Sequence, residues 1–156
     1  MDDSVSTLVN VRAIATRVRR ALEDLPEDKW PSTWTSFPGG TCGDTSLVLG
    51  AFLADAGFGG FEYVSGEGER REEDGICPSH AWLQRDQLVV DITADQFADG
   101  PGPVVVAENP EWHHRFRVMW KDAGDFREHP SKHVGAARQL YDFVKAWSDA
   151  DTLRGS

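Results

Sequence analysis

Three residue types in the middle of this sequence could together carry out acyl transfer: a cysteine, a histidine and an aspartate. Cys42 lies in the glycine-rich stretch FPGGTCGDTS, His80 lies in SHAWLQ, and Asp91 lies in QLVVDIT. A thiolate is a nucleophile, an imidazole can take up and return its proton, and a carboxylate can hold the imidazole in one orientation. Cys42, His80 and Asp91 are therefore candidate catalytic residues.

Cys42 is expected in the first turn of a helix that runs from about Thr41 to Ala56. Thr41 is a typical N-cap residue, and Asp44 stands where a capping box has its acidic residue. Free N–H groups at a helix start stabilise a thiolate, and with Gly43 they could also bind an oxyanion. The alternative is that Cys42 is a small buried hydrophobe, because free cysteine is among the most buried residue types.

His80 and Asp91 are expected to face each other across two antiparallel strands. A connection centred on Arg85 and Asp86 places His80 directly opposite Asp91, within reach of a hydrogen bond. Arg-Asp is not a favoured two-residue turn, so we expect a four-residue loop in the same register. The bland alternatives are a surface histidine and a turn aspartate. The opposite face of the two strands would carry an apolar set, Ala81, Leu83, Leu88 and Val90.

Periodicity predicts the remaining elements. Helices are expected over residues 5–25, 41–56 and 132–149, with Gly57 ending the second. Strands are expected at FEYVS, SHAWLQ, QLVVDIT, PVVVAE and, more weakly, RFRVMW, and EGERREEDG between the first two is expected to be a polar loop that could close over a cleft. This pattern predicts one α+β domain over residues 1–156, with helices around a mostly antiparallel sheet.

The stretch GTCGDTSLVLGAFLADAGFGGFEYVSG, followed by HAWLQ and LVVDIT, resembles the transglutaminase-like core of the papain-type thiol superfamily. The resemblance covers about residues 37–97. It implies a central helix that carries the nucleophile Cys42, packed on a sheet that carries His80 as general base and acid and Asp91 as its orienter. DIT stands where the family often has D-P-T, and the usual aromatic before that strand is absent, which leaves the acyl acceptor open.

Two further residues could contact a substrate. Gln96 could supply an amide to the substrate or the oxyanion, or be an ordinary polar loop residue. Trp82 could form a wall of a substrate groove, or shield the His80–Asp91 pair from water. His113 and His114 are adjacent and cannot share one strand face, so both are expected to be structural.

Cys77 allows three interpretations. It could be a loop thiol at the rim of the site, or it could form a disulfide with Cys42 that silences the nucleophile. It could also join Cys42, His80 and Asp91 in a zinc site, although no second C-x2-C/H pair supports that reading. We expect no metal and no cofactor.

Charge and composition narrow the partners and the location. The formal charge of −10 disfavours nucleic acid and anionic membranes as partners. The amino terminus has no basic and apolar leader, and no apolar run approaches the roughly 18 residues of a membrane span. Two cysteines make no disulfide framework. A soluble, cytoplasmic protein is therefore expected.

The predicted function is thiol-dependent chemistry on amide bonds, chiefly hydrolysis of a peptide, a protein or a small amide by a cysteine protease, amidase or deamidase. Transfer of the acyl group to an amine, as in transglutaminases, is the alternative. Two readings from other classes remain open: an inactive binding module whose acidic cleft holds a basic partner, and a zinc protein. The sequence leaves the oligomeric state open.

Overall fold

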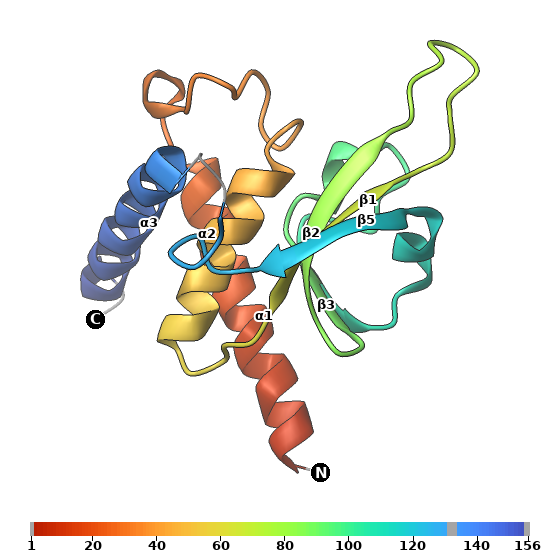
Figure 1. The fold of residues 1–156 in the computed structure, drawn as a ribbon. Helices are drawn as coiled ribbons and strands as arrows, with labels where there is room; N and C mark the ends of the chain where they lie inside the picture. Colours follow the sequence, from red (N-terminus) through yellow and green to blue (C-terminus); the bar gives the residue numbers. More distant parts are fainter. Residues whose placement is uncertain (1, 131–133, 155–156) are drawn as a thin grey trace.

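A computed structural model describes residues 2–130 and 134–154 of the protein. In these residues three α-helices pack on a five-stranded antiparallel sheet (Figure 1). The helices are α1 (Asp2–Glu23), α2 (Cys42–Asp55) and α3 (Val134–Arg154). The strands are β1 (Glu62–Glu67), β2 (Ser79–Arg85), β3 (Leu88–Asp91), β4 (Val105–Glu108) and β5 (Arg117–Ala123), in the order β4-β3-β2-β1-β5. The predicted α+β class is confirmed.

The predicted elements agree with the observed ones to within a few residues. The helices expected at 5–25 and 41–56 are α1 and α2. The helix expected at 132–149 is α3, which is described from Val134 onward; residues 132 and 133 lie outside the described residues. Gly57 follows α2 with a φ of 89°. That left-handed conformation suits a glycine and ends the helix as predicted.

Helix α2 lies between the other two helices and the sheet (Figure 1), so it is covered on most sides. Every residue from Thr45 to Ala51 is buried, as its nearly continuous apolar surface predicts. Gly50 is required in this helix, because a Cβ atom there would overlap the backbone carbonyl of Gly124. Tight packing of α2 thus holds the helix, and with it Cys42 at its amino-terminal end, in place.

Both faces of the sheet are covered. Leu83, Leu88 and Val90 join the main hydrophobic core with the helices, as predicted for that face. The opposite face carries a smaller cluster of Val64, Trp82, Val89 and Phe116. His80 projects from the same face of β2 as Trp82, because residues two apart on a strand share a face.

The connection between β2 and β3 differs from the prediction. It is a two-residue turn of Asp86 and Gln87, with Asp86 at a φ of 54°, rather than a four-residue loop around Arg85 and Asp86. Leu83 therefore pairs with Val90, two residues away from the predicted register. A shift of two residues keeps every side chain on its face, so His80 and Asp91 meet diagonally rather than directly.

The predicted capping box of α2 is wrong, although Thr41 does precede the helix. The Thr41 hydroxyl donates to the carbonyl of Pro38 at 2.9 Å and makes no cap bond. The Asp44 carboxylate accepts from Trp34 Nε1 at 3.0 Å. Both side chains thereby tie the glycine-rich loop and its aromatic neighbours to the start of α2.

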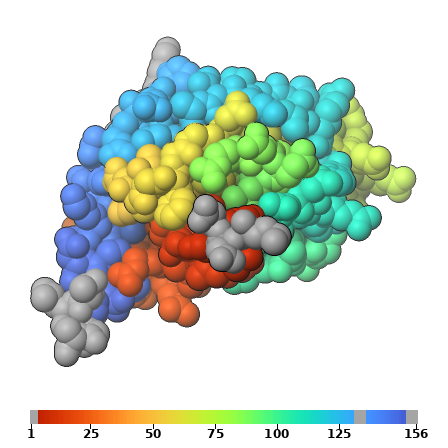
Figure 2. Space-filling view, turned by 90° about the horizontal axis from the view of Figure 1, so that it is seen from below, coloured from red at the N-terminus to blue at the C-terminus, as the bar shows by residue number. Residues whose placement is uncertain are grey.

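Seen from below, the blue carboxy-terminal helix and the green-to-teal segment around β4 lie on opposite sides of the red amino-terminal helix (Figure 2). Among the described residues, no helix combines the length and the apolar character that crossing a bilayer requires.

Candidate active site

His80 and Asp91 form a buried pair. Nε2 of His80 lies 2.6 Å from Oδ2 of Asp91, and each residue is 1% exposed. His80 is near the start of β2 and Asp91 is the last residue of β3, so two neighbouring antiparallel strands bring them together. The pairing expected from the sequence is present, through the diagonal register described above.

His113 joins this pair, which the sequence interpretation missed. It lies in the 3-10 helix η3 (Glu111–Arg115) and is 4% exposed, and its Nε2 is 2.7 Å from the same Oδ2 of Asp91. The neighbouring His114 faces outward and bonds Asn109. The argument that adjacent histidines cannot share a strand face does not apply, because the segment is not a strand. Nothing in the sequence pattern distinguished His113 from His114.

The surroundings of His80 and Asp91 favour a protonated imidazole and an ionised carboxylate. Burial opposes the charged form of His80, but hydrogen bonds and charge at Asp91 and Cys42 outweigh it and raise the pKa of His80 to about 9. Burial likewise opposes ionisation of Asp91, whereas bonds from His113, His80 and the backbone N–H of Thr93 lower the pKa of that carboxyl to about 2. Asp91 is therefore ionised and His80 readily carries a proton near neutral pH.

Cys42 is the first residue of α2 and is half-buried. It does not belong to the compact group of His80, Asp91 and His113, whose nitrogen and oxygen atoms all lie within 4.8 Å of one another. Within that group it acts on His80, whose pKa it helps to raise. Nε2 of His80 bonds Asp91 and Nδ1 lies 3.3 Å from the Gln96 amide nitrogen, so Nδ1 can exchange a proton with a thiol only where the Gln96 contact gives way.

Gln96 lies at the centre of these groups. Its Nε2 is 3.3 Å from Nδ1 of His80, and its Oε1 accepts from the backbone N–H of Gly40 at 3.4 Å. Its amide thus connects the His80 imidazole to the loop that leads into Cys42. Its Nε2 also donates to the carbonyl of Thr93 at 3.1 Å, so the amide is held within the protein, and its contact with a substrate or oxyanion stays a prediction.

A partly buried ion pair anchors the segment that carries Gln96. Arg19 is 6% exposed, and its guanidinium donates two bonds to the Asp95 carboxylate at 2.7 and 2.8 Å and one to the carbonyl of Ile92. This bidentate geometry fixes the short 3-10 helix η2 (Ala94–Gln96) against α1.

Gly43 and Tyr63 lie beside Cys42. A Cβ atom at Gly43 would come within 3.3 Å of the Tyr63 hydroxyl. Burial, together with the charges of Cys42 and Asp44, raises the pKa of Tyr63 to about 12. Tyr63 therefore keeps its proton as a possible hydrogen-bond donor near the thiol, and it is a second residue that the sequence interpretation did not single out.

Trp82 is packed inside the protein. It is 2% exposed, its ring centre is 5.8 Å from that of His80, and its Nε1 bonds Gln84. This position fits the shielding interpretation, since the indole keeps water away from the His80–Asp91 pair. Trp82 also lines a surface pocket together with Val89 and His113, and the groove-wall interpretation stays a prediction.

Within the described residues, the two cysteines and the acidic and histidine side chains do not form the zinc set or the disulfide considered from the sequence. Cys42 and Cys77 are both free thiols. The cluster able to hold an ion is His80, Asp91 and His113, which contains neither of the cysteines of the zinc set. In that cluster both histidines already bond the carboxylate directly, so an ion would have to displace two short hydrogen bonds.

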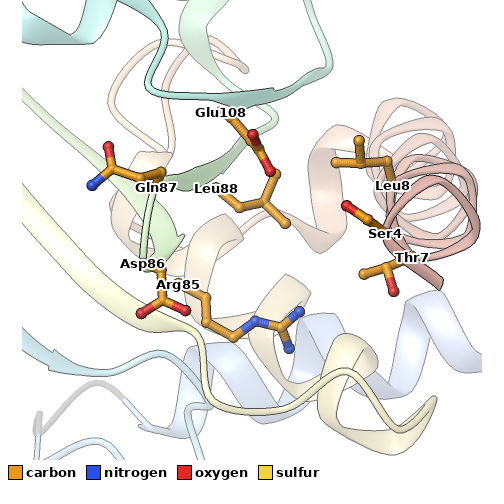
Figure 3. A pocket seen from close by; sticks show the side chains of 8 residues that line it. All are labelled: Ser4, Thr7, Leu8, Arg85, Asp86, Gln87, Leu88 and Glu108. Carbon is orange, nitrogen blue, oxygen red and sulfur yellow. The ribbon is translucent and has the colours of Figure 1, made fainter. Parts of the chain in front are cut away.

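A surface hollow elsewhere on the protein is separate from this group. It lies between α1 and the β2–β3 turn and is lined by Leu8, Arg85, Leu88 and Glu108, among others (Figure 3). Arg85 ends β2, whereas His80 is near its start. The hollow is therefore at the far end of the strand from the buried histidines.

The raised pKa of His80 predicts that stability falls as the pH rises. The folded-state pKa, about 9, exceeds the ordinary value of 6.5. The stabilisation is thus fully present below pH 6.5 and lost as the pH rises through 9, which amounts to about 3 kcal/mol of unfolding free energy. Urea unfolding across this range should show the decline. His80→Gln should flatten it and the exposed-site control His114→Gln should keep it; a wild type whose stability is constant would contradict it.

Comparisons of the chain with protein-family models, with curated proteins and with solved structures found no match.

Proposed function

We propose that this protein performs thiol-dependent acyl chemistry on amide bonds, with Cys42 as nucleophile, His80 as general base and acid, and Asp91 as the residue that orients His80. The observation that carries the proposal is the buried His80, whose Nε2 contacts Asp91 and whose pKa is raised in part by Cys42. The resemblance of residues 37–97 to the transglutaminase-like core supports the same assignment. We propose on the same ground that the α+β domain has the papain/transglutaminase-like fold.

In the proposed reaction the Cys42 thiolate attacks an amide carbonyl, and a carbon–sulfur bond forms while the carbonyl electrons move to the oxygen. Backbone N–H groups at the start of α2, including that of Gly43, and the Gln96 amide are suited to stabilise that oxyanion. Its collapse breaks the carbon–nitrogen bond, and protonated His80 gives its proton to the leaving amine. Water then attacks the thioester while His80 takes a proton from it, and collapse of the tetrahedral intermediate breaks the carbon–sulfur bond, which releases the acid and regenerates the Cys42 thiolate beside protonated His80.

We favour hydrolysis of a peptide, protein or small amide. The test is incubation with p-nitrophenyl acetate, with and without added methylamine, in the wild type, Cys42→Ser and Cys77→Ser. We expect release of p-nitrophenol by the wild type and Cys77→Ser, loss of this release in Cys42→Ser, and acetate as the main product. Chiefly N-methylacetamide would instead favour the transferase alternative, and equal release by all three proteins would refute thiol chemistry at Cys42.

A further inference from the structure

The buried His113 makes an unusual contact for a residue outside the proposed Cys-His-Asp set. Its Nε2 is 2.7 Å from Oδ2 of Asp91, and the same oxygen lies 2.6 Å from Nε2 of His80. The other carboxylate oxygen accepts the backbone N–H of Thr93 at 2.9 Å. Three donors thus hold one carboxylate that is almost fully removed from water.

This contact defines the tautomer of His113. An ionised carboxylate can only accept hydrogen bonds, so Nε2 of His113 carries a proton. When the ring is neutral, Nδ1 is a bare acceptor, and in the part of the chain that the structure describes it is buried with no hydrogen-bond partner. A buried acceptor without a partner is costly, so its retention suggests a purpose other than stability.

We propose that His113 is a positioning residue that fixes the Asp91 carboxylate for His80, an inference that rests on the proposed function. With bonds to Oδ2 from His113 and to Oδ1 from Thr93, the carboxylate cannot turn about its side-chain bond. Its Oδ2 therefore stays aimed at Nε2 of His80, and the imidazole stays oriented so that Nδ1 remains available to Cys42. The titratable groups that act on this arrangement are His113 on Asp91, and Asp91 and Cys42 on His80.

The test compares His113→Leu, which removes the donor, with His113→Gln, whose Nε2 can replace it. The readout is the rate at which iodoacetamide alkylates Cys42 across the pH range, in a Cys77→Ser background. We expect His113→Leu to lose about 10–100-fold at about pH 6, with the rate recovering at high pH, where any thiol is ionised. His113→Gln should stay within a few-fold of its parent.

The unfolding free energy separates positioning from packing. His113→Leu removes a donor to the buried Asp91 carboxylate, so we expect its unfolding free energy to fall, but its reactivity should fall about 10–100-fold even in buffer without urea, where the variant stays folded. Equal alkylation by His113→Leu and the parent would overturn the inference. A loss in both variants that merely follows their loss of stability would overturn it as well.

A measurement on the unmutated protein keeps the inference testable even if His113→Leu does not fold. Long-range nitrogen–proton NMR spectra of the imidazoles should show His113 with its proton on Nε2, and a proton on Nδ1 alone would refute the inference. Failure of the proposed function has a different signature. In that case Cys42 of the parent itself reacts only as an ordinary thiol, whatever residue stands at position 113.

Discussion

Replacing Asp91 with Asn is expected to slow the alkylation of Cys42 at about pH 6 by up to roughly 300-fold, the fall in thiolate fraction when a thiol returns to its ordinary pKa of about 8.5. The ionised carboxylate supports the raised pKa of His80. Without that charge the imidazole is neutral at this pH and cannot pair with a thiolate, so the nucleophile remains a thiol. The measurement is the iodoacetamide rate in a Cys77→Ser background, followed by mass spectrometry of the peptide that contains Cys42.

The same substitution should also destabilise the protein, by about 1–3 kcal/mol. The groups that bond the Asp91 side chain, from His80, His113 and Thr93, are all donors. An Asn side chain offers one acceptor and one donor, so its amide nitrogen would be set against a donor. Asp99→Asn is the matched control because Asp99 is exposed and pairs only at the surface with Arg115. If Asp91→Asn is alkylated as fast as this control, Asp91 does not orient the proposed base.

Replacing Gln96 with Leu is expected to reduce acylation by p-nitrophenyl acetate by about 100–1,000-fold, while alkylation by iodoacetamide stays within a few-fold. Acylation builds negative charge on a carbonyl oxygen, whereas alkylation does not, so only the first reaction needs an oxyanion donor. The Gln96 amide lies between His80 and the loop before Cys42, where such a donor could reach the oxygen.

The two rates together decide the role of Gln96. Equal losses in both reactions would assign it to holding His80 rather than to the oxyanion, and no loss in either would remove it from the site. Gln87→Leu is a suitable control, because Gln87 is an exposed residue of the β2–β3 turn. Its rates should match those of the wild type.

Local patterns predicted the elements of this fold well. The spacing of apolar residues marked α1 and α2, and alternation marked β2 and β3 with the correct inward face. Faces are encoded locally, since a side chain's side of a strand depends only on parity along the chain. The exact register was wrong by two residues, because it depended on whether Asp86 adopts the left-handed conformation that a two-residue turn needs.

The candidate site was predictable only where its residues lie on predictable elements. His80 and Asp91 belong to one hairpin, so a local argument could bring them together. His113 and Tyr63 reach the site through packing between distant segments, and the partly buried Arg19–Asp95 pair joins residues that are 76 positions apart. Such contacts are properties of the assembled core, and a single sequence read by local periodicity does not contain them.

The capping box predicted at the start of α2 is a local motif that the structure does not contain. Thr41 and Asp44 have the types and spacing of a capping box, yet each bonds a group in the preceding loop, Pro38 and Trp34 respectively. Groups in the preceding loop, rather than the N–H groups of the helix, bond both side chains. The consequence for the site is favourable, because the N–H groups at the start of α2 are left without those side-chain acceptors.

The most direct test of the central claim is to find where an acyl group becomes attached. The protein would be treated briefly with p-nitrophenyl acetate, quenched in acid, digested and mapped by mass spectrometry. The proposed mechanism predicts an acetyl thioester on Cys42, sensitive to hydroxylamine, and little or none on Cys42 in His80→Ala. Acetylation that falls on Cys77 or on lysines while Cys42 stays unmodified would contradict it.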